Sequence, residues 1–565
     1  MITVKQRLGF KDVFPDEEQA DTLTYLSKVS KDSLLRTIGF CNTEPLPNFD
    51  NFFSNPELSE LVQNRVQNYL LANRINGKPE TVTQQAALKF AELTLSNKTQ
   101  LLDSNLNNSV DDDELNLFKA FLCINSGLNG SQVLNNVDED NFEKLVDYSI
   151  VFTFPIADLA LFENNNIEFI NLVYTTFFKV EQLLEFLNSK SEYANLKNGL
   201  INSFNVTTEE EFVKQMTYLF GKLLQLKSDN SYLFEVDDEQ SLKFLESMSS
   251  EEIEVDVDFT HIKNNPIYKL DNKLFSIINY FFVVDKFYRS AKFKLKDLYV
   301  KDEELIAKHG NFFNFFNTQF SEKFLMKNIL DEIFEKKYFV KKPDTEIELP
   351  GEPDYYLRHN NDVFVFENKD ILVAKDIKAS ADIEQINTVL KTKFLHDGKK
   401  HVGIGQLINT IIEIAQKAFR FDNYVNTKNS LTIYPILLVH DRIFQTLGIN
   451  YRLNNWFKEQ CEIRLSGLNH NLTIKNLTVI DIDTLILWLP YFKLKDKNFR
   501  DVLDLHLNRM GKKKKVANAP NEEEGLYRVN RNLSEQLTPI SARKIPYNIN
   551  LELLLNRFKN VLKDE

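Results

Sequence analysis

The sequence predicts a chain of two unlike parts, a mainly α-helical N-terminal part and an α/β C-terminal part. Over residues 1–250 apolar residues recur at the spacing of amphipathic helices, most clearly in 56–72, 86–95, 166–187 and 209–226. From residue 311 onward, helical stretches alternate with runs of β-branched and aromatic residues that are typical of strands. We therefore expect a helical domain over 1–250 and an α/β domain with a C-terminal extension over 311–565.

The segment between these parts supports the same division. The acidic stretch 249–258 marks the boundary. Beyond it, 266–299 alternates apolar and polar residues in the manner of strands. We expect a strand-containing lead-in over 259–310.

The two parts also differ in charge. Residues 301–565 hold 40 Lys and Arg against 36 Asp and Glu, a net of +4, and residues 1–300 hold 28 against 45, a net of −17. A phosphate backbone is attracted by clustered cations and repelled by an acidic surface. We expect the C-terminal part to bind nucleic acid, and the acidic N-terminal part to serve sensing, specificity or assembly through a protein partner or self-association.

Composition narrows the class of protein. The three cysteines have no C-x-x-C spacing, which excludes a disulfide framework and a Cys-based zinc site. The start of the chain has no hydrophobic signal region, and the apolar runs are too short to span a bilayer. These features predict a soluble, cytoplasmic protein without a membrane partner.

The elements of the C-terminal part follow the order α, β, β, β, α, β. The corresponding stretches are 320–338, 339–349, 354–359, 362–369, 405–419 and 430–439. Their periodicity and composition distinguish the two helices from the four strands.

The second and third strands are expected to form a tight hairpin. Asn360 and Asn361 separate them, a pair that tolerates the positive φ of a two-residue type I′ turn. Counted outward from this turn, Asp354 falls opposite Glu367, with Cβ atoms roughly 4.5–5.5 Å apart. Lys369 lies two residues beyond Glu367 and shares its face of the sheet. Two carboxylates and an ammonium therefore converge on one patch.

This patch is typical of a metal site. Facing carboxylates repel each other, so one must take up a proton or both must share a cation. Carboxylate oxygens suit Mg²⁺ or Mn²⁺, which keep positions for water and phosphate oxygens. In the structural alternative, Lys369 only neutralises Glu367 while Asp354 caps its strand, because short motifs also arise by chance.

Together, the element order, Pro353-Asp354 and Glu367-Asn368-Lys369 resemble the PD-(D/E)xK nuclease superfamily, over residues 312–488. The resemblance implies a restriction-endonuclease-like core, αβββαβ with a mixed sheet. It also implies an endonuclease that depends on Mg²⁺ (or Mn²⁺) and hydrolyses nucleic acid, DNA in preference to RNA. Many proteins of this build act in bacterial anti-phage defence or restriction, and we expect an effector of that kind.

The resemblance assigns roles to individual residues. Asp354 and Glu367 would hold the metal, with the backbone carbonyl of Asn368 as a third ligand. Lys369 would orient the attacking water or help to deprotonate it.

Two further positions carry open alternatives. Glu322 matches an auxiliary acidic residue of many members, a catalytic and metal-binding position, but could equally be an exposed helix carboxylate. Gln406 resembles a Gln that often opens the helix near the scissile phosphate, but could equally be a solvated N-terminal helix residue. The chain departs from the common pattern by an insertion over 370–402 with a helical stretch at 380–395, which puts the role of Gln406 in doubt.

Two other functions compete with a metal-dependent nuclease. Arg500 and His506 fit the loose pattern of HEPN ribonucleases, which attack through the ribose 2′-OH without a metal. The second alternative is a catalytically inactive protein that binds nucleic acid or another protein. The acidic and basic residues of the hairpin argue against this alternative. The basic run 512–515 fits a solvated loop or a phosphate contact.

Overall fold

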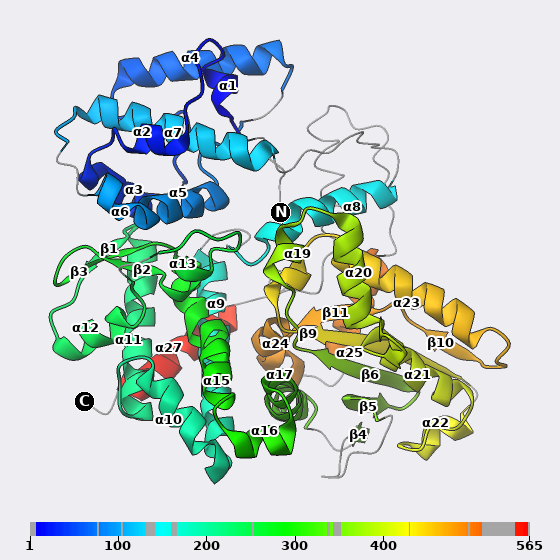
Figure 1. The fold of residues 1–565 in the computed structure, drawn as a ribbon. Coiled ribbons are helices and arrows are strands. Elements are labelled where there is room, and N and C mark those ends of the chain that lie inside the picture. Colours follow the sequence, from blue (N-terminus) through cyan, green and yellow to red (C-terminus); the bar gives the residue numbers. More distant parts are fainter. Residues whose placement is uncertain are drawn as a thin grey trace.

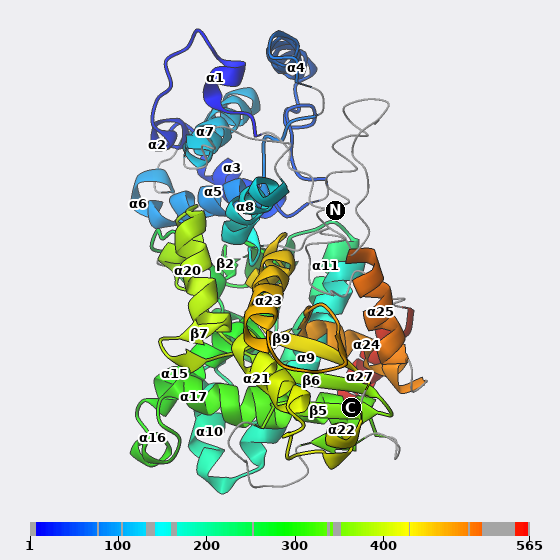
Figure 2. The ribbon, with the colours of Figure 1, turned by 90° about the vertical axis from the view of Figure 1, so that its right-hand side faces the viewer.

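The computed structural model describes residues 7–43, 45–75, 78–102, 106–130, 142–159, 166–250, 253–335, 340–342, 352–428, 430–494, 498–510 and 548–562. Within these residues the fold is mixed α/β, with helices around a six-stranded mixed sheet (Figures 1 and 2). This confirms the expected fold class at the level of a helical N-terminal part and an α/β C-terminal part.

The first helical group lies at the top of Figure 1. It contains α1 (Phe10–Val13), α2 (Thr22–Leu26), α3 (Lys31–Phe40), α4 (Pro56–Ala72), α5 (Gln84–Ser96), α6 (Lys98–Leu101) and α7 (Val110–Gly130). Side chains of Ser30, Asn55 and Thr83 accept backbone N–H groups at the starts of α3, α4 and α5, which satisfies donors that have no partner within the helix. The predicted helices at 56–72 and 86–95 are confirmed.

A second helical group follows and carries a small antiparallel sheet of order β1-β3-β2. Its helices are α8 (Phe142–Thr153), η1 (Phe154–Ile156), α9 (Asn166–Asn188), η2 (Ser191–Tyr193), α10 (Ala194–Asn202), α11 (Glu209–Ser228), α12 (Glu239–Glu246), α13 (Thr260–Asn264), α14 (Tyr280–Asp285), η3 (Lys286–Ser290), α15 (Ala291–Tyr299), α16 (Glu303–His309) and α17 (Phe312–Phe315), and its strands are β1 (Leu233–Glu235), β2 (Ile267–Lys269) and β3 (Leu274–Ile277).

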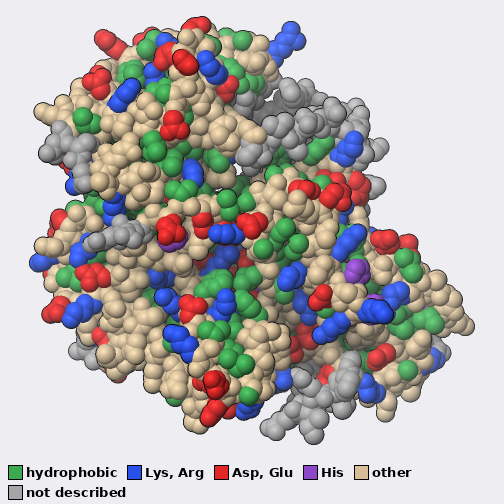
Figure 3. All heavy atoms as spheres, in the orientation of Figure 1, with side chains coloured by type: hydrophobic (Ala, Val, Ile, Leu, Met, Phe, Trp, Pro, Cys, Tyr) green, Lys and Arg blue, Asp and Glu red, His purple; other side chains and the backbone are tan. Residues whose placement is uncertain are grey.

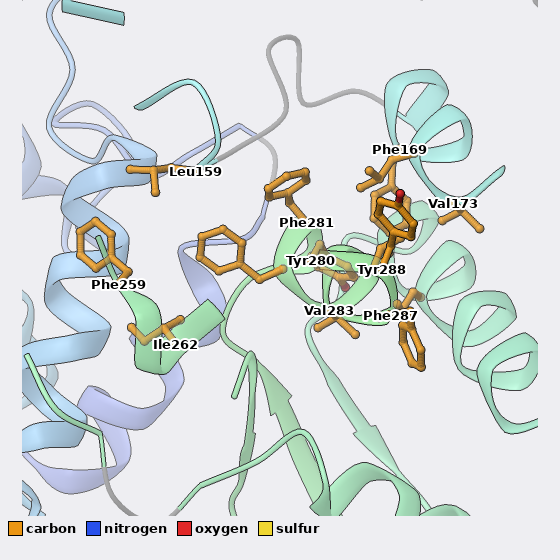
Figure 4. Packing of buried hydrophobic residues seen from close by; sticks show 14 of the residues in the cluster. Leu159, Phe169, Val173, Phe259, Ile262, Tyr280, Phe281, Val283, Phe287 and Tyr288 are labelled. Carbon is orange, nitrogen blue, oxygen red and sulfur yellow. The ribbon is translucent and has the colours of Figure 1, made fainter. Parts of the chain in front are cut away.

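The lead-in is only partly strand-like. β2 and β3 bear out the prediction of strands, but α14, η3 and α15 form one helical run where we expected strands. Its apolar residues at 280–284 are buried all round, and Asn279 caps its start, so the run reads as a strand by composition and folds as a buried helix. Tyr280 packs on Phe169 of α9, whereas the ring of Phe287 packs on Phe204 and Phe220 and points away from α9 in Figure 4.

The C-terminal part contains the remaining elements. They are η4 (Phe316–Met326), α18 (Lys327–Ile333), β4 (Val340–Lys342), β5 (Tyr355–His359), β6 (Asp362–Lys369), α19 (Lys375–Ala379), α20 (Ile383–Phe394), β7 (His396–Asp397), β8 (Lys400–His401), α21 (Ile404–Ala415), α22 (Asn423–Thr427), β9 (Leu431–Val439), η5 (Arg442–Gln445), α23 (Ile449–Leu465), β10 (Leu472–Ile474), β11 (Thr478–Asp481), α24 (Ile482–Leu494), α25 (Asn498–Met510) and α27 (Asn548–Leu562). The order of the central elements is that predicted from sequence, with α19, α20 and the β7–β8 hairpin inserted. The basic run 512–515 lies outside the described residues.

The large sheet has the order β10-β9-β6-β5-β4, and β11 pairs with β9 beyond β10. β4, β5 and β6 are antiparallel neighbours, whereas β6, β10 and β11 run parallel to β9. The carboxyl ends of β6, β9 and β11 therefore meet at one edge, because Lys369 and Asp481 both pair with Val439.

The two faces of this sheet are buried in different cores. Phe364, Phe366 and Leu438 belong to a core that is continuous with the helices of residues 1–334. Val363, Val365 and Leu437 belong to a second core with α20, α21 and α23, which α8 also joins. The division at 250–259 stays a prediction, but helices from both sides of it pack on the sheet.

No described helix has the length and apolarity that crossing a lipid bilayer would require.

Candidate metal and nuclease site

The structure forms the expected hairpin. β5 and β6 pair from His359 opposite Asp362 to Tyr355 opposite Phe366, and one step further this register brings Asp354 across from Glu367. Of the two turn residues only Asn360 has a positive φ, of 53°. The expected type I′ turn, which needs a positive φ at both central residues, is therefore wrong, although the register that it predicted is right.

Lys369 lies between the two carboxylates. Its Nζ is 3.3 Å from Glu367 Oε2 and 3.9 Å from Asp354 Oδ2. The same oxygen of Asp354 accepts a hydrogen bond of 2.7 Å from the backbone N–H of Asn368. The Glu367 side chain is 1% exposed, against 12% for Asp354 and 16% for Lys369. The three groups form an ion cluster that reaches solvent only through Asp354 and Lys369.

The electrostatics of this cluster favour an added cation. Burial, and then the negative charge of Asp354, raise the pKa of Glu367 well above its ordinary value, and Lys369 only partly opposes this. Burial lowers the pKa of Lys369, but Asp354 and Glu367 outweigh it and hold the pKa above its ordinary value. The single ammonium of Lys369 thus faces the two carboxylates of Asp354 and Glu367. The side chains of this cluster therefore do not fully neutralise the two carboxylates.

Glu322 approaches the same cluster from the helical side. Its charge contributes to the raised pKa values of both Glu367 and Lys369. It lies on η4, an 11-residue π-helical segment, and such segments are rare and often occur at functional sites. Glu322 is therefore near enough to Glu367 and Lys369 for its charge to influence both, and its role at the site stays a prediction.

Gln406 has a different immediate partner. Its side-chain Oε1 accepts the backbone N–H of Gly403 at 2.8 Å, so the side chain caps α21. The helix start itself is close to the cluster, because a Cβ added to Gly403 would lie 3.4 Å from Lys369 Cε. The observed contact of Gln406 is thus to its own helix, and α21 begins beside the lysine.

The sequence analysis missed a second layer of polar groups at the carboxyl edge of the sheet. Asn368 Oδ1 shares a hydrogen bond of 2.7 Å with His440 Nε2, and His440 directly follows β9. Burial lowers the pKa of His440 to about 4, with Asp370 opposing, so the ring is neutral near pH 7. A signal for this layer is present in the sequence. Asp370 directly follows β6 and His440 directly follows β9, and parallel neighbouring strands end at the same edge of a sheet.

Asp370 anchors this layer to the helices. It accepts hydrogen bonds from Lys292 Nζ at 2.7 Å and Ser321 Oγ at 2.5 Å. Burial raises the pKa of Asp370, but Lys292 and then His440 and Ser321 lower it to about 2. Ser321 directly precedes Glu322, so the π-helical segment η4 contacts both polar layers.

A buried ion cluster joins the helical part to the insertion. Fully buried Asp158 contacts Lys263 at 3.2 Å, Arg289 at 2.8 Å and Lys378 of α19. Burial raises the pKa of Asp158, but Arg289, Lys378 and Lys263 reverse this and leave the pKa far below its ordinary value. These contacts connect segments far apart in the chain, which no local sequence pattern could indicate.

The pair expected for a metal-independent ribonuclease has two different environments. Arg500 contacts Asp362 at 3.3 Å and Asp501 at 3.1 Å. His506 is 4% exposed. Arg500 is engaged in ion pairs and His506 is buried, so neither side chain is placed to act on the ribose of a bound RNA.

The donor set fits a divalent cation in its chemistry. Asp354 and Glu367 offer oxygens in a region short of positive charge, which Mg²⁺ or Mn²⁺ favours. Across the described ranges no group of three or more His, Cys, Asp or Glu is arranged to hold a metal ion. The predicted set has three such residues, Asp354, Glu367 and Glu322, beside the Asn368 carbonyl, and the described structure does not bring the three acids into one metal-binding group. A metal-binding role for these residues stays a prediction.

Comparisons of the chain with protein-family models, curated proteins and solved structures found no match.

Proposed function

We propose that this chain is a metal-dependent endonuclease that hydrolyses phosphodiester bonds, with DNA as the favoured substrate and Mg²⁺ or Mn²⁺ as cofactor. The single observation that carries the proposal is the cluster in which Lys369 Nζ lies 3.3 Å from Glu367 and 3.9 Å from Asp354. We place this cluster in a restriction-endonuclease-like core made of η4 and α18, β4 to β6, α21 and β9.

The element order supports this placement. β6 and β9 are parallel neighbours, and β5 and β6 form the hairpin. A defence role against phage or foreign DNA belongs to the same proposal and rests on the resemblance of the sequence.

Each residue of the cluster has a distinct part in the proposed reaction. Asp354 and Glu367 would hold the cation, with the Asn368 carbonyl and Glu322 as further candidate oxygens. When bound, the ion lowers the pKa of a coordinated water and neutralises charge that develops on phosphorus. Lys369 keeps its proton because two carboxylates adjoin it, so it orients the water and donates to a phosphate oxygen.

The test uses the purified full-length chain. Supercoiled plasmid DNA and a structured RNA are each incubated with Mg²⁺, Mn²⁺ or EDTA, beside Asp354→Asn, Glu367→Gln and Lys369→Ala. We expect DNA cleavage in Mg²⁺ or Mn²⁺ and none in EDTA. Loss of a ligand charge should lower the rate by two or more orders of magnitude, which corresponds to roughly 3 kcal/mol or more of transition-state stabilisation.

The variants Arg500→Ala and His506→Ala serve as matched controls. They should cut at the rate of the parent chain. If these two lose activity while the three cluster variants keep it, the chain is a metal-independent ribonuclease. If no metal supports cleavage of either substrate, the chain is not a nuclease of this class.

A further inference from the structure

The insertion places a small basic hairpin on the surface. β7 (His396–Asp397) and β8 (Lys400–His401) pair antiparallel, and all four residues are exposed. Residues 391–401 hold four lysines and two histidines against one aspartate. Figure 3 shows histidine side chains among Lys and Arg side chains on the right-hand part of the molecule.

The cations of this hairpin are available to a ligand. Most lysines near the site are occupied, such as Lys292 by Asp370 and Lys378 by Asp158. By contrast, within the described residues the side chains of Lys393, Lys399 and Lys400 form no ion pair or hydrogen bond. Cations without an internal partner keep their full attraction for phosphate.

Two glycines at the start of α21 lie close to the hairpin and to Lys369 respectively. A Cβ on Gly405 would lie 2.5 Å from the carbonyl oxygen of Leu395 and 3.0 Å from His401 Cβ, so only glycine lets the hairpin pack this closely on α21. Gly403, two residues earlier, borders Lys369, with 3.4 Å from an added Cβ to Lys369 Cε. The start of α21 therefore lies next to His401 of β8 at Gly405 and next to Lys369 at Gly403.

We propose that the β7–β8 hairpin grips the sugar-phosphate backbone of duplex DNA next to the scissile phosphate, with Lys399 and Lys400 as the contacting side chains. The occupant follows from charge complementarity, since exposed lysines whose side chains have no partner among the described residues lie on the insertion that leads into the helix start bordering Lys369. The inference rests on the proposed nuclease function and deepens it by naming the surface that holds the substrate. The insertion that separates Gln406 from Lys369 in sequence is thus a substrate-binding element.

The test compares two double variants of the full-length chain. Lys399→Gln/Lys400→Gln removes the hairpin charges. Lys31→Gln/Lys559→Gln removes the same charge from exposed lysines of α3 and α27, which lie away from β7 in Figure 2. Binding of a labelled duplex DNA and a labelled RNA is measured by fluorescence anisotropy in EDTA, from 50 to 300 mM salt.

We expect the hairpin variant alone to change. Its slope of log K against log salt for duplex DNA should be smaller by about 2, and its affinity weaker on the order of tenfold near 100 mM salt, since each phosphate contact contributes about 0.9 to the slope. In Mg²⁺ its KM for DNA should rise while kcat stays near that of the parent chain, because no group of the ion cluster has changed.

Each other outcome separates the inference from the function on which it rests. If the hairpin variant binds DNA with the salt slope and the affinity of the parent chain, the hairpin does not hold the DNA backbone, even if the parent chain cuts DNA. Weakened binding of RNA with unchanged binding of DNA makes RNA the occupant and overturns the assignment to DNA. If the hairpin variant loses DNA affinity but no metal supports cleavage by the parent chain, the grip stands and the nuclease proposal fails.

Discussion

Replacing Glu367 by glutamine should change how the stability of the metal-free protein depends on pH. Burial and Asp354 raise the pKa of Glu367, so the folded chain holds this proton more tightly than the unfolded chain does. The stability that the proton provides is fully present below the unfolded pKa of about 4.3. It is lost as the pH rises through the folded pKa. In EDTA the parent chain should therefore become less stable from pH 5 upward, and the Glu367→Gln chain should lack this part of the loss.

The magnitude follows from proton linkage. One group bound in the folded state and free in the unfolded state changes the unfolding free energy by up to about 1.4 kcal/mol per pH unit. Unfolding entropy scales with length, so this corresponds to about 1 °C per pH unit if all 565 residues unfold together, or about 3 °C for a unit of about 200 residues. Added Mg²⁺ at 100 times its Kd should restore about 2.7 kcal/mol to the parent chain.

Thermal unfolding in EDTA at pH 5, 6, 7 and 8 measures the effect. Glu459→Gln, at an exposed position of α23, removes the same charge without touching the cluster and should follow the parent curve. The quantity compared is the change of midpoint with pH, since any substitution also shifts the absolute midpoint for other reasons. Parallel curves for the parent chain and Glu367→Gln would refute the idea that Asp354 and Glu367 are short of positive charge.

Three further changes test neighbouring parts of the structure. Lys369→Ala should abolish cleavage while Mg²⁺, titrated by calorimetry, still binds, because the lysine acts on water and phosphate; loss of binding as well would assign it to holding the ion site. Gly403→Ala should destabilise the chain by about 1–3 kcal/mol in urea unfolding, since Gly403 has a φ of 50° and an added Cβ would lie 3.0 Å from the Phe394 carbonyl oxygen; an unchanged midpoint would contradict this backbone geometry. Lys292→Met should cost about 3–5 kcal/mol by leaving Asp370 buried without its ammonium. It should also reduce the loss of stability as the pH falls from about 4 toward the pKa of about 2 of Asp370; an unchanged acid profile would argue against that ion pair.

The sequence by itself determined the features that depend on neighbours along the chain. The two-residue turn and the two-residue period of strands were enough to bring Asp354 opposite Glu367, because each paired position is counted directly from the turn. The 3.6-residue period located α4 and α9 closely. The same reasoning failed for 280–299, where the alternation of apolar and polar residues suggested strands. The helical run starts at 280–284, which is buried on every side and has no period by which a buried helix differs from a buried strand.

Only the tertiary structure decided how distant segments complete the site. Lys292 meets Asp370 across 78 residues, and His440 meets Asn368 across 72, and no local period encodes such contacts. The position of the π-helical segment η4, whose Ser321 hydrogen-bonds to Asp370, also depends on what packs around it. The insertion looked from sequence like an interruption, but the helix start that follows it borders Lys369 at Gly403 and His401 at Gly405. The physical reason is that periodicity and turn chemistry act over a few residues, whereas burial and charge pairing act between whatever surfaces the folded chain brings together.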